Sequence, residues 1–137
     1  MLRRMFATVL VLLGAGTAFA APEVTGNWII PDRTALIAID HCGTGLCGRI
    51  AKALVIKPGH PSTDVHNPNK AYRNRPLVGL QILSGFAAGQ DRWDQGTIYD
   101  PESGKSYKSI LRLNADGSLK VSGCVLFICQ SQRWTRN

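Results

Sequence analysis

Short apolar segments, several of them with apolar residues at every second position, are separated by turn-forming residues through most of the chain. This alternation is typical of half-buried β-strands, and the glycine, proline and asparagine residues between the segments mark turns. The segments fall at residues 23–31, 35–40, 46–54, 77–83, 93–100, 105–113, 119–123 and 129–136. No stretch between them has the period of an amphipathic helix. We therefore predict an all-β fold, an eight-stranded antiparallel up-and-down barrel, because closure removes the exposed edges of an open sheet.

The connections between these segments are mostly short. Residues 41–50 join two strands through a glycine-rich link and predict a hairpin. Residues 84–86, Ser-Gly-Phe, predict a turn. Residues 55–76 are different, because their repeated prolines and polar residues favour a loop rather than a helix. A loop of this length in a small domain is usually functional or mobile.

The N-terminus has the three parts of a secretory signal peptide. A basic start (Arg3 and Arg4) precedes an apolar stretch at residues 7–15 and the small-x-small motif Ala18-Phe19-Ala20. The apolar stretch is short for a transmembrane anchor. We therefore predict export to the periplasm.

Cleavage would remove residues 1–20 and leave residues 21–137 as a single domain. The mature chain would have 117 of the 137 residues, and losing two arginines lowers the formal charge from +7 to +5. This length is sufficient for one hydrophobic core. We expect no nucleic-acid partner for an exported chain. The basic charge is compatible with contact to anionic envelope surfaces, but we prefer the simpler interpretation that it serves solubility.

The four cysteines form two pairs with the same spacing, Cys42 with Cys47 and Cys124 with Cys129. An even number of cysteines in an exported protein indicates disulfides. Local pairing would close two small rings, each contributing roughly 2 kcal/mol in the chain-entropy model. Pairing between the two groups would instead clip the ends of the domain together. A zinc site of all four cysteines fits the spacing less well, and we predict no metal and no cofactor.

The motif Gly26-Asn27-Trp28 resembles the Gly-x-Trp signature of the lipocalins and related calycins. In that family a basic residue from the last strand packs on the tryptophan at the closed end of the barrel. The resemblance implies that Arg133 or Arg136 has this role here, with the guanidinium stacked on the indole. The alternative is an ordinary core tryptophan.

A second resemblance covers nearly the whole predicted mature chain. It rests on a series of motifs in fixed order: Gly26-x-Trp28, Cys42-Gly43-x-x-Leu46-Cys47-Gly48-x-Ile50, Asp64-x-x-Asn67-Pro68, Arg73-x-Arg75-Pro76-Leu77-x-Gly79-Leu80, Trp93-x-x-Gly96-x-Ile98-Tyr99-Asp100-Pro101, Gly104-Lys105-x-Tyr107, Gly123-Cys124 and Trp134-Thr135-Arg136. Together they resemble the exported bacterial domain-of-unknown-function family 2147. The resemblance implies a lipocalin-like barrel in the cell envelope and assigns no reaction.

The long loop concentrates polar side chains, and two interpretations of them stay open. Arg73 or Arg75 could bind a carboxylate or phosphate of a ligand, with the loop acting as a lid. Alternatively, Asp64 and Asn67 order the loop while an arginine pairs with Asp64 or Asp100.

Three aromatic residues, Trp93, Tyr99 and Tyr107, are candidates to line a cavity with Arg73 and Arg75. They could equally fill the barrel. We find no arrangement of residues typical of a catalytic site, and we predict no enzymatic activity.

These observations support a periplasmic lipocalin-like protein that binds a small, largely apolar or lipid-like ligand. An acidic head group on the ligand would meet Arg73 or Arg75. The alternative is an interaction or structural module of the envelope, with a filled barrel and a loop that binds a protein partner. The sequence does not define the oligomeric state.

Overall fold

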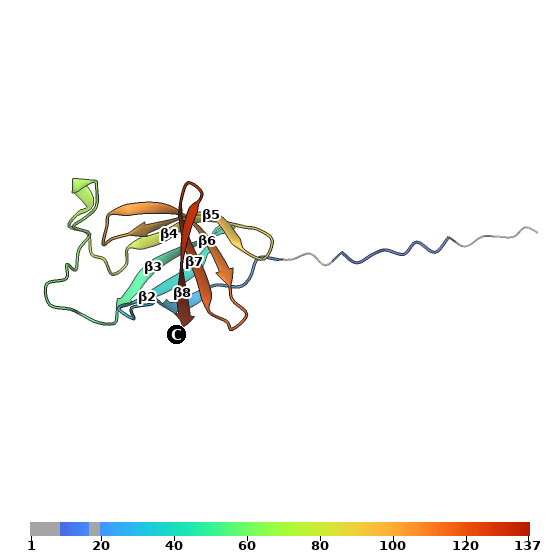
Figure 1. Ribbon diagram of the computed structural model, residues 1–137, viewed down its shortest axis with the longest axis horizontal. Coiled ribbons are helices and arrows are strands. Elements are labelled where there is room, and N and C mark those ends of the chain that lie inside the picture. Colours follow the sequence, from blue (N-terminus) through green and yellow to red (C-terminus); the bar gives the residue numbers. More distant parts are fainter. Residues whose placement is uncertain (1–8, 17–19) are drawn as a thin grey trace, which may run out of the picture.

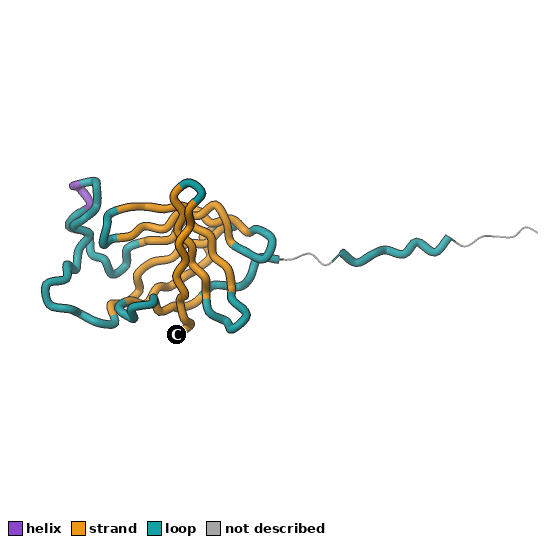
Figure 2. Tube along the Cα trace, viewed as in Figure 1, coloured by secondary structure: helices purple, strands orange, loops and turns teal. Residues whose placement is uncertain are grey.

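The computed structural model describes residues 9–16 and 20–137 and shows a closed barrel in which each strand pairs with its neighbours in sequence. All pairings are antiparallel, and β1 also pairs with β8 (Figures 1 and 2). The strands are β1 (Gly26–Ile29), β2 (Ala35–Cys42), β3 (Gly45–Ala53), β4 (Gln81–Ala88), β5 (Trp93–Asp100), β6 (Lys105–Leu113), β7 (Leu119–Val125) and β8 (Ile128–Arg136). The predicted eight-stranded antiparallel barrel is confirmed.

Tight turns set the register of two hairpins. Cys42 pairs with Gly45 at the end of the β2–β3 hairpin, where Gly43 has a positive φ of 62°. Val125 pairs with Ile128 at the end of the β7–β8 hairpin, which leaves a turn of two residues. Because inward and outward side chains alternate along each strand, these registers decide which residues enter the barrel.

One end of the barrel is filled by aromatic side chains and closed by the segment before β1. The side chains of Trp28, Trp93 and Trp134 are buried there. The indole nitrogen of Trp28 donates to the carbonyl of Val24 at 2.9 Å, and that of Trp93 donates to the carbonyl of Pro22 at 2.8 Å. These bonds satisfy the polar atoms of the indoles and hold the N-terminal segment across this end.

The predicted strand at residues 77–83 and the predicted turn at residues 84–86 are wrong. The strand β4 begins at Gln81 and continues through residues 84–86 to Ala88. Gly79 has a φ of 92°, which interrupts an extended chain, and Leu77 to Leu80 therefore belong to the loop. Gly85, with a φ of 73°, lies between Leu83 and Phe86, where the pairing with β3 shifts register, so this glycine permits a bulge rather than a turn.

The connection between β3 and β4, residues 54–80, contains one 3₁₀-helix, η1 (Lys70–Tyr72), and extends one residue before and four residues after the predicted loop. Before the barrel, residues 9–16 form neither helix nor strand. Arg3, Arg4 and Ala18-Phe19 of the predicted signal peptide lie outside the described residues. No helix in residues 9–16 and 20–137 is long and apolar enough to span a bilayer.

Candidate functional site

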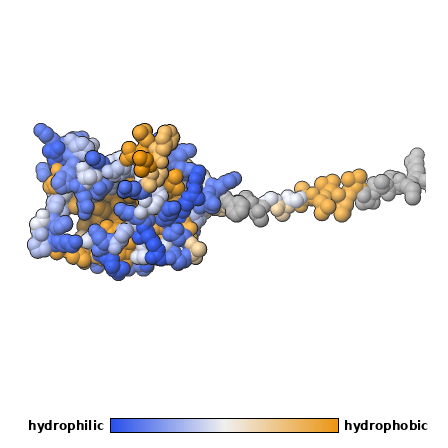
Figure 3. All heavy atoms as spheres, viewed as in Figure 1, coloured by the Kyte–Doolittle hydropathy of each residue, from blue (hydrophilic) through white to orange (hydrophobic). Residues whose placement is uncertain are grey.

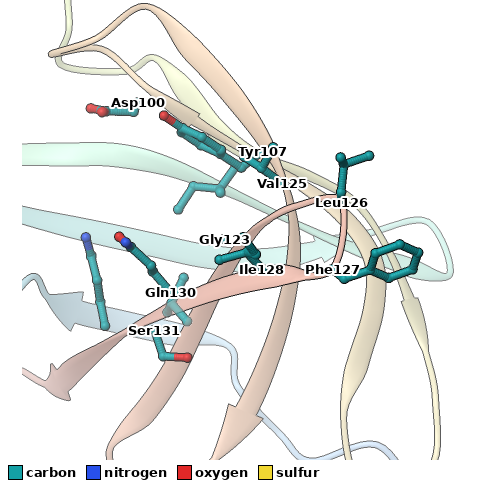
Figure 4. A pocket seen from close by; sticks show the side chains of 12 residues that line it. Asp100, Tyr107, Gly123, Val125, Leu126, Phe127, Ile128, Gln130 and Ser131 are labelled. Carbon is teal, nitrogen blue, oxygen red and sulfur yellow. The ribbon is translucent and has the colours of Figure 1, made fainter.

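A cavity of about 660 Å³ occupies the half of the barrel opposite the tryptophan-filled end. It lies between strands β5 to β8 and the turn that joins β7 to β8 (Figure 4). The lining residues are Ile98, Asp100, Tyr107, Val121, Gly123, Val125, Leu126, Phe127, Ile128, Gln130, Ser131 and Gln132. The barrel is therefore filled at one end and hollow at the other.

The cavity is open because two neighbouring strands differ in length. The nine-residue strand β8 pairs with the four-residue strand β1 only at Thr135 and Arg136. The rest of β8 extends past the turn between β1 and β2, so its inward side chains reach solvent. Figure 3 shows the surface hollowed beside the β7–β8 hairpin, with apolar residues inside the hollow.

The lining is mainly apolar, with a few polar groups. Figure 4 shows the polar ends of Asp100, Tyr107 and Gln130 directed toward one side of the cavity. Gln132 accepts a hydrogen bond of 3.0 Å from the indole of Trp134, which holds its carbonyl and leaves its amide donors available. An apolar chamber with a small number of oriented polar groups is the usual form of a small-molecule site.

Next to this chamber lies a buried hydroxyl that has no partner. Ser109 is buried, and its register partner on β7 is the cavity-lining Gly123. Among the residues that the structure describes, no group forms a hydrogen bond with the Ser109 hydroxyl. An unsatisfied buried hydroxyl is unfavourable, so this position would gain from a polar partner.

The closed end carries the contact that the Gly-x-Trp resemblance implies. The guanidinium carbon of Arg136 lies 4.2 Å from the ring centroid of Trp28, and its Nη1 donates to the carbonyl of Thr25 at 3.0 Å. Gly26 has a φ of 122°, and a Cβ there would lie 2.9 Å from Nη1 of Arg136. Arg133 instead forms an ion pair with Asp116, in the turn before β7.

The long loop is held to the outer face of β5 by one buried carboxylate. Asp64 is fully buried and accepts hydrogen bonds from Tyr99 at 2.6 Å, from Asn67 at 2.8 Å and from Arg75 at 3.1 Å. Burial alone would raise the pKa of Asp64, but these three donors outweigh burial and hold its pKa below the usual value. Burial and the adjacent carboxylate raise the pKa of Tyr99 to about 12.

Of the five residues predicted to bind a ligand, the structure places only Tyr107 in the cavity lining. Tyr99 and Arg75 contact Asp64 outside the barrel, and Arg73 donates to the carbonyl of Asn67 at 2.8 Å. Trp93 lies at the closed end. Both arginines thus have the loop-ordering contacts of the alternative interpretation.

The cysteines are paired locally, Cys42 with Cys47 and Cys124 with Cys129. Each disulfide lies at the end of a hairpin, across β2–β3 and across β7–β8. In the described parts of the chain, no group of three His, Cys, Asp or Glu side chains could hold a metal ion.

The sequence interpretation missed the cavity residues on β8 and in the β7–β8 turn. Ile128, Gln130 and Gln132 alternate along one face of the strand together with the buried Trp134. Two glutamines on the face that carries a core tryptophan are a signal for an open, partly polar interior. Four successive apolar residues between Cys124 and Cys129 were a second signal.

Comparison with known proteins supports the barrel assignment. A solved structure described as "Protein HP1028 from the human pathogen Helicobacter pylori belongs to the lipocalin family" matches with a TM-score of 0.73 and 19% sequence identity, covering 84% of this chain and 83% of that chain. The fold is therefore lipocalin-like. The family model described as "Uncharacterized protein conserved in bacteria (DUF2147)" matches residues 26–136, as the sequence motifs had indicated. No curated protein sequence matches the chain significantly.

Proposed function

The chain belongs to the bacterial family DUF2147, and from this premise we propose that it is a periplasmic protein that binds a small, largely apolar ligand in its barrel. The observation that carries the proposal is the open apolar cavity of about 660 Å³ between β5 and β8. This volume lies within the roughly 300–1,000 Å³ range of small-molecule sites. A lipocalin-like barrel of eight strands is wide enough to hold one such ligand.

The cavity lining also suggests the chemistry of the ligand's polar end. No lysine or arginine is among the lining residues, whereas a carboxylate, a phenol and two carboxamides are. Arg73 and Arg75, which the sequence suggested for an acidic head group, are engaged in the loop. We therefore favour an uncharged head group, such as a hydroxyl or amide, which Gln130 and Gln132 can bond without an unpaired buried charge.

Two observations support the periplasmic location. The sequence predicts a cleaved signal peptide over residues 1–20, and the structure contains two disulfides with no free cysteine among the described residues. Disulfides form and persist in exported proteins. Recovery of the protein in the reduced form from the cytoplasmic fraction would contradict this part of the proposal.

The alternative function, an envelope interaction module, assumed a filled barrel and a loop that is free to bind a partner. The open cavity and the attachment of the loop through Asp64 favour ligand binding instead.

A displacement titration tests the proposal. The protein is unfolded in guanidinium chloride, refolded to remove any bound ligand and titrated with the uncharged fluorophore N-phenyl-1-naphthylamine. We expect saturable binding of one molecule, displaced more effectively by dodecanol than by dodecanoate. Absence of saturable binding by any of these compounds would contradict a ligand site, and stronger displacement by dodecanoate would contradict the uncharged head group.

A further inference from the structure

The β7–β8 hairpin ends in an apolar tip formed by residues 125–128. Leu126 and Phe127 form its two-residue turn and are 89% and 99% exposed, with Val125 and Ile128 also exposed beside them. The Cys124–Cys129 disulfide joins the two strands immediately below. Figure 3 shows the tip as a compact apolar patch on a largely polar face. Exposed apolar patches of this kind mark interaction sites.

The shape of the tip fits a lipid surface. The hairpin projects from the rim of the barrel (Figure 1), so its four apolar residues can enter a bilayer without carrying a charged side chain with them. Leu126 has a φ of 54°, a conformation that glycine adopts more readily in such turns. Because glycine would fold more readily at this position, the exposed leucine indicates that its side chain is used for contact with a partner rather than for folding.

The charge on the neighbouring strands is complementary to an anionic surface. Strands β6, β7 and β8 contain six lysine and arginine residues and no aspartate or glutamate, and two of the six, Lys105 and Lys108, lie in the half of the strands toward the tip. Lys108 pairs in register with Cys124, which places it beside the base of the tip, and Lys105, whose register partner on β5 is Asp100, begins the same strand. None of the ion pairs in the described part of the chain involves Lys105 or Lys108.

We propose that the 125–128 tip docks the protein on anionic phospholipid bilayers, with Leu126 and Phe127 inserted among the acyl chains and Lys105 and Lys108 at the phosphates. Membrane binding commonly requires two such signals, an apolar anchor and basic residues. All four tip residues also line the cavity, so docking places its opening at the membrane. The inference goes beyond ligand binding and does not depend on it.

Vesicle flotation tests the docking. The purified protein is mixed with vesicles of phosphatidylethanolamine and phosphatidylglycerol, and the floated fraction is compared with that for phosphatidylcholine vesicles. We expect flotation with the anionic vesicles, and a decrease in affinity of at least about tenfold for the double variant Leu126→Ser/Phe127→Ser, since each side chain loses its apolar burial. Lys105→Gln/Lys108→Gln should weaken binding to anionic vesicles alone.

Matched variants separate the tip from general effects. Ile56 in the long loop is also 89% exposed, so Ile56→Ser removes an equally exposed apolar side chain elsewhere and should leave flotation unchanged. Phe127→Trp provides a reporter, because Trp28, Trp93 and Trp134 are buried. Its emission should shift to the blue when anionic vesicles are added, whereas that of Ile56→Trp should not. Circular dichroism verifies that each variant is folded.

Several results would overturn the proposal. These are no flotation of the unchanged protein with either vesicle, full flotation of the folded Leu126→Ser/Phe127→Ser variant, an equal loss in Ile56→Ser, or no spectral shift in Phe127→Trp. Concentration-dependent self-association through the tip, without flotation, would identify a second copy of the chain as the partner instead. A Gly123→Leu variant, with its cavity partly filled, should still float, which distinguishes failure of docking from failure of ligand binding.

Discussion

Filling the cavity from Gly123 should weaken ligand binding while leaving the fold intact. Gly123 lines the cavity in the middle of β7, and a Cβ built on it would lie 3.6 Å from the Cβ of Tyr107 and 3.8 Å from Cγ2 of Ile98. Both distances are ordinary van der Waals contacts, so the strand accepts a side chain here. In Gly123→Leu, four carbon atoms would project into space that a ligand otherwise occupies.

The magnitude follows from the apolar burial that a ligand loses. At about 0.8 kcal/mol for each buried methylene, displacing four ligand carbons costs about 3 kcal/mol of binding free energy. This corresponds to an increase in Kd of about a hundredfold, and less if the ligand shifts within the cavity. The free energy of unfolding should rise by about 0.5–1 kcal/mol, because a glycine within a strand is replaced by a residue with less backbone freedom in the unfolded chain.

The assay is titration with N-phenyl-1-naphthylamine beside urea denaturation of the same samples. Ser122→Leu is the matched control, since the neighbouring residue points to the outer face of β7 and is not part of the cavity lining. It should bind the fluorophore as the unchanged protein does. A Kd of Gly123→Leu within about threefold of the original would refute the assignment of the cavity, and destabilisation beyond about 2 kcal/mol would show that the space is absent.

Three further predictions concern the fold. Trp28→Ala should lower the free energy of unfolding by about 3–5 kcal/mol in urea denaturation, because the buried indole closes the barrel. In ultraviolet titration of the folded protein, Tyr99 should ionise near pH 12, since its hydroxyl donates to Asp64. The pKa of Tyr99 is raised by folding, so its stabilising contribution is present below pH 10 and lost toward pH 12; a tyrosine titration identical to that of Tyr99→Phe would contradict this. Removing the Cys124–Cys129 disulfide by a double serine substitution should lower stability by about 2 kcal/mol and leave a folded barrel by circular dichroism.

The strand pattern was predictable because alternation depends on local sequence. Residues 105–113 alternate except at Ile110 and coincide with β6, and residues 119–123 alternate and fall within β7. The error at β4 has a different origin. A glycine such as Gly85 can form a turn or a bulge, and the pairing with the partner strand β3 decides which one forms. The single sequence contains no information on that pairing.

The candidate site was less predictable because it depends on which side chains meet. Arg73 and Arg75 looked suited to an acidic ligand, but the buried Asp64 and the carbonyl of Asn67 hold them in the loop. The opening of the cavity arises from the unequal lengths of β1 and β8, which emerge only when the barrel closes.

Native mass spectrometry of the protein isolated from its producing cells would test ligand binding most directly, with a denaturing measurement of the same sample. Ligand binding predicts a native mass above that of the polypeptide, with the excess lost on denaturation and identified as an apolar molecule. The denatured mass should show all four cysteines oxidised and residues 1–20 removed. A native mass equal to that of the polypeptide, together with no uptake of N-phenyl-1-naphthylamine, would contradict a ligand-binding barrel.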